Sequence, residues 1–289
     1  MQAGCLDSRL INEVLEAPSE FIRFLNSRSE IYQVLKSAAR FEAERLFSAE
    51  AGVPVSFGPF GIIIFPFFRM GAVDSRNLFD IDELLLFNFY WKNRDIYRNF
   101  LDIGANIGLH TLIALRCGFN VRSFEPDPVH FARLTETLMH NPCSLTPDIY
   151  QAALSISTGR RQFCRVKGNT TGSHLAGAKA SPYGELEYFD VDVENALLHI
   201  QWADLVKMDV EGHEAAIICA CDAALFNTTD IIAEVGTAEN ASLIFEHLSL
   251  LGVNMFPQKK NWNKATSLED VPCNYKEGSI LISKKRQVF

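Results

Sequence analysis

Acidic side chains stand at the ends of several apolar runs in this chain. Asp102 lies in "FLDIGANIGLHT", and Glu125 follows in "RSFEPDP". Lys207, Asp209 and Glu211 alternate in "KMDVEGHE". Carboxylates pair with cations, accept hydrogen bonds from hydroxyls and take up protons. These residues therefore predict a site that binds a cationic, hydroxyl-bearing ligand and moves a proton.

The first of these runs leads into a glycine-containing loop that does not have the spacing of a phosphate loop. A dinucleotide fingerprint reads Gly-x-Gly-x-x-Gly, whereas this loop has Gly104, Asn106 and Gly108. It also lacks the Gly-Lys-Ser/Thr ending of a nucleoside triphosphate loop. The carboxylate of Asp102 would repel a phosphate and attract an ammonium group. The loop therefore disfavours a nicotinamide-dependent oxidoreductase and favours a ligand without phosphates.

Glu125 adds a second requirement on the ligand. A carboxylate at the end of the neighbouring strand can accept hydrogen bonds from both hydroxyls of a ribose. A ligand with an amino-acid head, a ribose and no phosphate is S-adenosylmethionine, which we predict as the cofactor. The residues expected to bind it are Asp102, Gly104, Ala105, Asn106, Gly108 and Glu125.

The elements that position these side chains are expected to form an α/β domain. Five apolar runs alternate with helical stretches: "NFLDI", "NVRSF", "DIYQAAL", "ADLVKMD" and "DIIAEV". This alternation is typical of a parallel sheet with helices on both faces, in which ligands bind at the carboxyl ends of the strands. "GVNMF" and "SILISKK" are expected to form a final antiparallel pair. Residues 155–186 are expected to form a long, irregular loop with a functional role.

Residues 1–98 are expected to form an extension to a domain that spans residues 99–289. The extension is expected to begin with an amphipathic helical arm capped by Ser29. Its apolar positions recur at helical spacing: Ile31, Val34, Leu35, Ala38 and Phe41. "VPVSF" and "IIIF" predict a β-hairpin, and a helix over residues 80–93 follows. Homo-oligomer formation through this arm is an alternative that the pattern leaves open.

The second half of the chain resembles the FkbM-type family of S-adenosylmethionine-dependent methyltransferases. The matching segments lie between about residues 100 and 235: "FLDIGANIGLHTLIAL", "FEPDP", "AALS", "GNTTGSHL", "DLVKMDVEGHEAAII" and "IIAEV". The resemblance implies a Rossmann-like, seven-stranded class I methyltransferase sheet with helices on both faces and an antiparallel last strand. It also implies O-methylation of a hydroxyl on a sugar, glycan or other small molecule. N-methylation of an amide, and a non-catalytic methyltransferase-like module that binds partners, stay open as alternatives.

Five residues are candidates for the transfer step. In-line attack on an activated methyl donor mainly needs positioning and a base that takes the proton. We expect Asp209 and Glu211 to flank the transfer, with one of them as the base, and Lys207 to neutralise an acid. Glu234 would orient the acceptor or Lys207, and His213 is a further candidate base because its ordinary pKa suits that role. Asp209, Glu211 and Glu234 could approach a magnesium ion, but the chain lacks a compact ligand motif, so we predict that the reaction needs no metal.

Composition limits the partners and the compartment that we expect. The net charge of −8 argues against a nucleic-acid binder. The apolar run "FGIIIFPFF" is too short to span a membrane. The start, "MQAGCLDSRLINEV", lacks the apolar core of a secretory signal, so we expect a cytoplasmic protein. The seven cysteines form no Cys-x-x-Cys pair, which argues against a zinc site or a disulfide framework.

Overall fold

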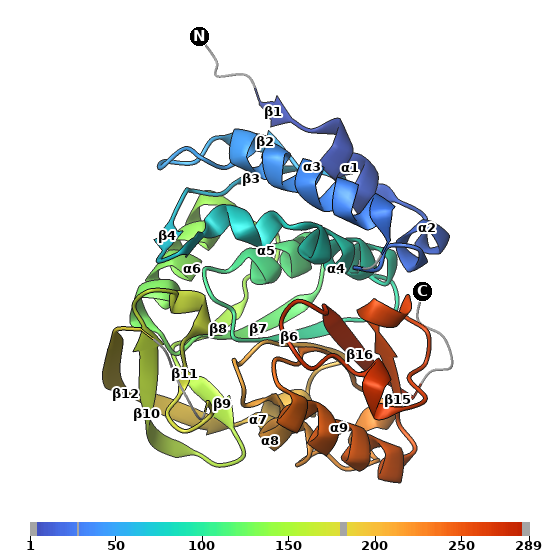
Figure 1. Ribbon diagram of the computed structural model, residues 1–289. Coiled ribbons are helices and arrows are strands. Elements are labelled where there is room, and N and C mark those ends of the chain that lie inside the picture. Colours follow the sequence, from blue (N-terminus) through green and yellow to red (C-terminus); the bar gives the residue numbers. More distant parts are fainter. Residues whose placement is uncertain (1–4, 28, 180–183, 285–289) are drawn as a thin grey trace.

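A seven-stranded mixed sheet forms the centre of the computed structural model, which describes residues 5–27, 29–179 and 184–284 (Figure 1). Its strands stand in the order β15-β16-β14-β13-β6-β7-β8. Five neighbouring strands are parallel, and β16 runs antiparallel to both β14 and β15. The strands are β6 Asn99–Ile103, β7 Asn120–Phe124, β8 Asp148–Tyr150, β13 Leu205–Met208, β14 Asp230–Glu234, β15 Asn254–Pro257 and β16 Ser279–Ser283. This topology confirms the predicted sheet and its antiparallel final pair.

Helices cover both faces of this sheet, as predicted. Successive residues of a strand point to opposite faces, so Phe100 packs in one hydrophobic core and Leu101 in the other. The first core contains residues of α4 Ile81–Lys92 and α5 Leu109–Arg116, with α6 Pro128–His140 on the same side in Figure 1. The second contains residues of α7 Ala196–Ile200, α8 Glu214–Ile218 and α9 Ala238–Leu251.

The order of the strands places two loops side by side. The strands β6 and β13 are neighbours, although β6 connects along the chain to β7 on its other side. Ligands of open α/β sheets bind at such a switch point. Lys207 on β13 lies opposite Asp102 on β6, and the Asp209 amide donates to the Ile103 carbonyl at 3.0 Å. The loops that follow these two strands therefore start from adjacent positions.

A second, four-stranded sheet replaces the loop that we expected at residues 155–186. It has the order β11-β10-β12-β9, with β9 Ala153–Ser155, β10 Gly159–Val166, β11 His174–Leu175 and β12 Leu186–Asn195. The prediction of a long irregular loop was wrong, because "GRRQFCRV" is an exposed, basic strand at its first four residues and lacks the apolar character of a buried one. The run "DIYQAAL" also divides, since β8 belongs to the first sheet and β9 to the second.

The N-terminal residues form a layer outside α4 and α5 (Figure 1). Its helices are α1 Arg9–Glu16, α2 Ser19–Arg23 and α3 Glu30–Leu46, and its small sheet joins β1 Leu6–Asp7 to the hairpin of β2 Pro54–Ser56 and β3 Ile62–Ile64. The hairpin, the Ser29 cap and the helix near residue 80 are confirmed. This layer shares the first hydrophobic core. A boundary at residue 99 stays a prediction.

The buried face of α3 differs from the one that the apolar spacing predicted. The buried side chains are Tyr32, Ala39, Ala43 and Leu46. Ile31, Val34 and Phe41 are 47%, 66% and 64% exposed. The prediction was wrong because small residues let α3 approach its neighbours closely, and Tyr32 donates to the carboxylate of Asp82 at 2.7 Å. Homo-oligomer formation through this arm stays a prediction.

Within the described ranges, none of the helices combines the length and the apolar character that a membrane crossing requires.

Candidate active site

The loop after β6 and the end of β13 are in close contact at Gly104. Gly104 has a φ of +78°, and a Cβ built there would overlap the Asp209 carbonyl oxygen. The amides of Gly104 and Ala105 both donate to the Phe124 carbonyl at 3.0 Å, which ties the loop to β7. Glycine is needed here because a side chain would both strain the left-handed backbone and separate the two loops. The glycine position that the sequence singled out thus has a structural reason.

Asp102 lies beneath this loop and does not line the pocket beside it. Its side chain is fully buried and accepts a hydrogen bond from the Thr111 hydroxyl at 2.7 Å. Lys207 Nζ lies 3.8 Å from Asp102 Oδ1 and donates to the Gly104 carbonyl at 3.0 Å. Burial alone would lower the pKa of Lys207, but the nearby carboxylates of Asp209 and Asp102 outweigh it and raise that pKa. The charged Lys207 side chain therefore connects Asp102 to the loop after β6.

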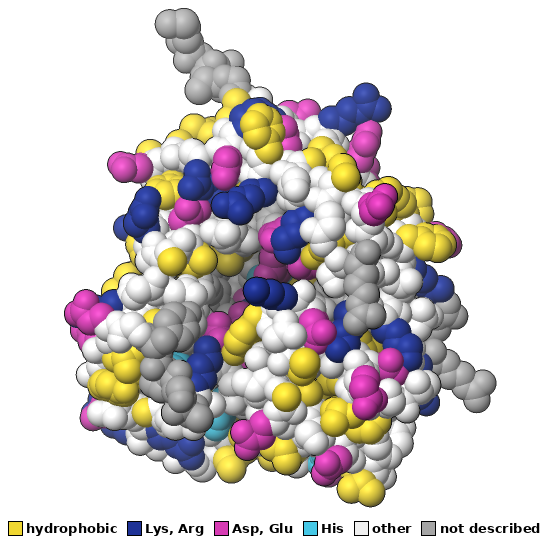
Figure 2. Space-filling model, viewed as in Figure 1, with side chains coloured by type: hydrophobic (Ala, Val, Ile, Leu, Met, Phe, Trp, Pro, Cys, Tyr) yellow, Lys and Arg dark blue, Asp and Glu magenta, His cyan; other side chains and the backbone are white. Residues whose placement is uncertain are grey.

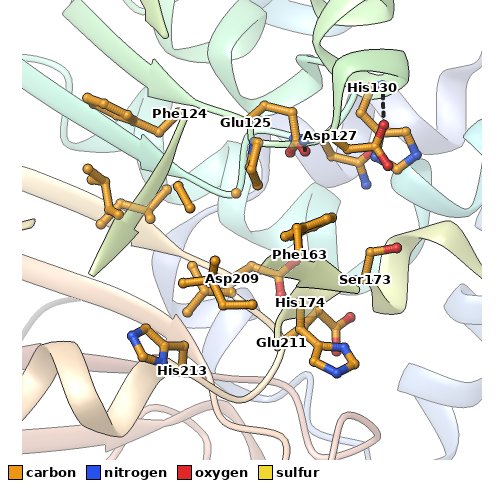
Figure 3. Close-up of a pocket in the computed structure, with 18 of the residues that line it drawn as sticks. Phe124, Glu125, Asp127, His130, Phe163, Ser173, His174, Asp209, Glu211 and His213 are labelled. Carbon is orange, nitrogen blue, oxygen red and sulfur yellow. Dashed lines mark hydrogen bonds between the residues drawn. The ribbon is translucent and has the colours of Figure 1, made fainter. Parts of the chain in front are cut away.

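A pocket with an empty volume of about 610 Å³, here called pocket A, opens beside the loop (Figure 3). Of the predicted cofactor residues, Gly104, Asn106 and Glu125 line it. Ala105 and Gly108 do not, since Ala105 is buried and Gly108 stands at the start of α5, against Leu134. The second sheet and the connection between β10 and β11 close the pocket with these side chains: Phe163, Thr170, Thr171, Ser173, His174 and Leu175.

Glu125 is buried at the wall of pocket A with both carboxylate oxygens held by the backbone. Oε2 accepts from the Asn106 amide and Oε1 from the Asp127 amide, each at 2.8 Å. Burial raises the pKa of Glu125 to about 8, and the two amide donors oppose that rise. The two hydrogen bonds thus fix the orientation of the Glu125 carboxylate, and its charge changes as the pH passes through about 8.

A second cavity, here called pocket B, has an empty volume of about 900 Å³ and lies toward the N-terminal layer. Residues from several separated segments line it: Met70, Val73, Asn77, Leu78, Glu83, Asn169, Gly172, Lys179, Glu234 and Tyr275. Figure 2 shows a hollow on this face with Asp and Glu side chains inside it and Lys and Arg side chains at its rim. Pockets A and B share four lining residues: Asn106, Thr171, Asp209 and Glu211. A molecule in one pocket would therefore meet a molecule in the other at this wall.

Asp209 lies in the shared wall, and one of its two carboxylate oxygens lacks a hydrogen-bond partner among the described residues. This oxygen, Oδ1, is buried, and Oδ2 lies 3.8 Å from Lys207 Nζ. Burial raises the pKa of Asp209, while the charge of Lys207 opposes the rise. Because a carboxylate that lacks donors holds a proton more readily, Asp209 is suited to accept one.

Glu211 shares this wall but is held by two partners. It has a φ of +55°, forms a short ion pair with Lys179, and accepts a hydrogen bond from Tyr275. The strand ends at Met208, so the alternating orientation of Lys207, Asp209 and Glu211 does not persist. Burial and the charge of Asp209 raise the pKa of Glu211, and Lys179 opposes them.

Glu234 and His213 fall on different sides of the shared wall. Glu234 lines pocket B, and burial together with the charges of Asp209 and Glu83 raises its pKa well above the ordinary value. His213 lines pocket A, where its Nε2 lies 2.9 Å from the Ser155 hydroxyl, and burial lowers its pKa. The structure therefore brings Asp209, Glu211 and Glu234 to one cavity and separates His213 from it. Among the described side chains, no group of three or more His, Cys, Asp or Glu is arranged to hold a metal ion.

Sequence reasoning missed several residues that shape this site. Glu214 is fully buried and accepts from the amides of Val210 and Gly212 and from Asn240, which fixes the turn after Asp209. Glu83 lies 2.8 Å from His110 at the wall of pocket B. Glu214 ends the quoted "KMDVEGHE" motif and could have been found there, whereas Glu83, Lys179 and Tyr275 lie in segments without such a signal.

Comparison with known proteins agrees with this geometry. Residues 102–252, just over half of the chain, match the model of the methyltransferase FkbM domain. The hexuronic acid methyltransferase AglP of Haloferax volcanii is 33% identical over 134 residues, which cover 46% of this chain and 54% of that protein. The match thus spans about half the length of this relative.

Solved structures that are similar to this chain include two methyltransferases. A SAM-dependent methyltransferase from Agrobacterium tumefaciens aligns with a TM-score of 0.43 and 10% identity, covering 82% of this chain and 72% of that one. The ribosomal protein L11 methylase from Lactobacillus delbrueckii subsp. bulgaricus aligns with a TM-score of 0.39 and 11% identity, covering 70% and 78%. The family match confirms the resemblance seen in the sequence: the chain belongs to the FkbM family of S-adenosylmethionine-dependent methyltransferases.

Proposed function

We propose that this protein transfers the methyl group to a hydroxyl oxygen of a sugar or sugar-containing acceptor. The observation that carries the proposal is the wall shared by pockets A and B, formed by Asn106, Thr171, Asp209 and Glu211. The relative named as a hexuronic acid methyltransferase supports a sugar-related acceptor.

The hydrogen-bonding groups at the wall of pocket A suit S-adenosylmethionine. Gly104 lets the loop after β6 lie directly against the Asp209 backbone at the wall of pocket A. Asn106 has a buried amide oxygen without a hydrogen-bond partner among the described residues. Glu125 would accept from the ribose hydroxyls, as the sequence predicted. Asp102 would act through Lys207 instead of contacting the ammonium group. When bound, the cofactor supplies a methyl group already activated by its sulfonium.

Pocket B fits a hydroxyl-bearing acceptor. Two of its carboxyl groups lie beside a lysine, because Asp209 pairs with Lys207 and Glu211 with Lys179, and Glu83 lies 2.8 Å from His110. Burial and the neighbouring carboxylates raise the pKa of Glu234 and so favour its neutral form. Paired carboxylates can still accept hydrogen bonds from hydroxyls.

Asp209 is the residue that we assign as the base. It lines both pockets and has a raised pKa, so it can take the proton from a hydroxyl that faces pocket A. Glu211 is engaged by Lys179 and Tyr275, which suits a role in orienting the acceptor. Glu234 would donate a hydrogen bond to the acceptor, and His213 would line the cofactor side. With these roles, the extension of residues 1–98 forms one wall of pocket B, the proposed acceptor cavity.

The test uses cofactor with a labelled methyl group. The protein is incubated with a panel of sugars and uronic acid glycosides and with a cell extract, and mass spectrometry locates the label. We expect the label on a sugar oxygen, and Asp209→Asn is the matched control that should fail to transfer it. Label on an amide nitrogen, or equal transfer by the control, would contradict the proposal.

A further inference from the structure

The connection between β10 and β11 borders both pockets. Thr170, Thr171 and Ser173 line pocket A, and Asn169 and Thr171 line pocket B. This segment, residues 167–173, is here called the bridging loop. Its placement therefore decides the shape of both pockets at the wall where they meet.

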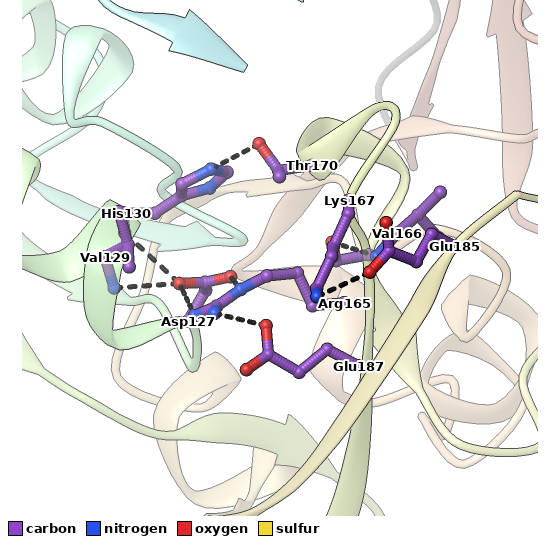
Figure 4. Close-up of polar contacts among 10 residues, drawn as sticks. Asp127, Val129, His130, Arg165, Val166, Lys167, Thr170, Glu185 and Glu187 are labelled. Carbon is purple, nitrogen blue, oxygen red and sulfur yellow. Dashed lines mark hydrogen bonds and ion pairs between the residues drawn. The ribbon is translucent and has the colours of Figure 1, made fainter. Parts of the chain in front are cut away.

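One side of the bridging loop is held by the methyltransferase domain (Figure 4). His130 Nε2 on α6 lies 2.9 Å from the Thr170 hydroxyl. At the end of β10, Arg165 forms two bonds of 2.6 Å with Asp127 and a third, of 2.9 Å, with Glu187. Asp127 also donates its amide to Glu125, so this attachment leads directly to the wall of pocket A.

The other side of the bridging loop is held by the N-terminal segment. The short strands β4 Arg69–Met70 and β5 Val73–Asp74 form a hairpin whose turn is Gly71 and Ala72. The Ala72 amide donates to the Gly168 carbonyl at 2.7 Å, and Gly71 forms an antiparallel bridge with Asn169. The bridging loop thus gains a backbone pairing with a segment far away in the sequence.

Glycine is required at this pairing. Gly71 has a φ of +90°, and a Cβ there would overlap the backbone of Gly168. By contrast, Gly61 in the neighbouring hairpin has a φ of +75° and nothing within 4 Å of a built Cβ. The two glycines impose a similar backbone conformation, but the contact with the bridging loop belongs to Gly71.

We propose that Gly71 and Ala72 are positioning residues for the methyl transfer, because they hold the bridging loop against pocket A. The inference rests on the assignment of pocket A to the cofactor. Met70 and Val73 flank the same turn and line pocket B. The turn therefore connects the two pockets, and we expect a ligand in pocket A to slow hydrogen exchange in this turn at the wall of pocket B.

Two measurements on the full chain test this proposal. The first is the affinity for S-adenosylhomocysteine by isothermal titration. We expect Gly71→Ala to bind at least five-fold more weakly than the wild type, and Gly61→Ala to stay within two-fold of it. Equal affinity of the two variants would overturn the proposal.

The second measurement uses the wild type and does not depend on the folding of a variant. Hydrogen exchange is compared with and without S-adenosylhomocysteine. We expect slower exchange in residues 71–73 together with the bridging loop, although this turn does not line pocket A. Slower exchange in the bridging loop alone would overturn the proposal. Wild-type protein that does not bind S-adenosylhomocysteine at all would instead overturn the assignment of pocket A, and this inference with it.

Discussion

Replacement of Gly104 by alanine tests the close contact between the loop after β6 and the end of β13. The new Cβ would lie 1.9 Å from the Asp209 carbonyl oxygen, whereas real Cβ atoms essentially never come closer than 3.0 Å. The two segments must therefore separate by about 1 Å. A left-handed backbone with a side chain costs roughly 1–2 kcal/mol in addition. A misplacement of about 1 Å at a reacting centre can cost on the order of a hundred-fold in rate.

The control is Gly118→Ala, which separates backbone strain from the overlap. Gly118 has a φ of +87°, and nothing lies within 4 Å of its built Cβ. We expect Gly104→Ala to bind S-adenosylhomocysteine more than ten-fold more weakly by isothermal titration, a loss of about 1.4 kcal/mol or more. Gly118→Ala should lose stability by thermal unfolding but keep its affinity. Similar affinity in both variants would refute the claim that the two loops meet at the cofactor.

Two further predictions concern buried carboxyl groups. We propose that ribose hydroxyls donate to the ionised form of Glu125, whose pKa is about 8. Affinity for S-adenosylhomocysteine should therefore rise as the pH rises through 8 and fall below it. Isothermal titration across this pH range should show that the affinity of Glu125→Gln does not change with pH. If its affinity still changes with pH, Glu125 is not the source of the effect. Glu214→Ala removes the acceptor of the Val210 and Gly212 amides and one of the two acceptors of the Asn240 side chain. It should lower the free energy of unfolding by about 1–3 kcal/mol. Glu214→Gln, which keeps one acceptor, should lose less in denaturant unfolding, and an equal loss would argue against the hydrogen-bonding role.

The sequence predicted the central sheet and its ligand edge for a simple reason. Buried parallel strands are continuous apolar runs, and their charged ends stand out against them. Asp102, Glu125 and Asp209 were all found by this contrast. The structure shows that position at a strand end does not fix the direction of a side chain: Asp102 points beneath the loop to Thr111, while Glu125 and Asp209 reach pocket A.

The lining of pocket B could not be predicted from the sequence because it is assembled from distant segments. Glu83, Lys179 and Tyr275 come from a helix, a loop beyond β11 and a loop before β16, and none lies in an apolar run with a charged end. The β10–β12 pairing was missed for a related reason, since its outer residues are polar and exposed. Exposed strands in a small sheet lack the burial pattern that marks strands in a sequence.

We propose that Asp209 takes the acceptor proton at the wall between the two pockets. The most direct measurement is a single turnover with prebound, methyl-labelled S-adenosylmethionine and an acceptor identified by the labelling assay. Because a positioned base contributes roughly 10²–10⁴-fold, Asp209→Asn should slow transfer by at least a hundred-fold while it binds the cofactor within about three-fold of the wild type. In the wild type, the rate should fall as the pH falls through the raised pKa of Asp209. Transfer by Asp209→Asn at the wild-type rate would contradict the account.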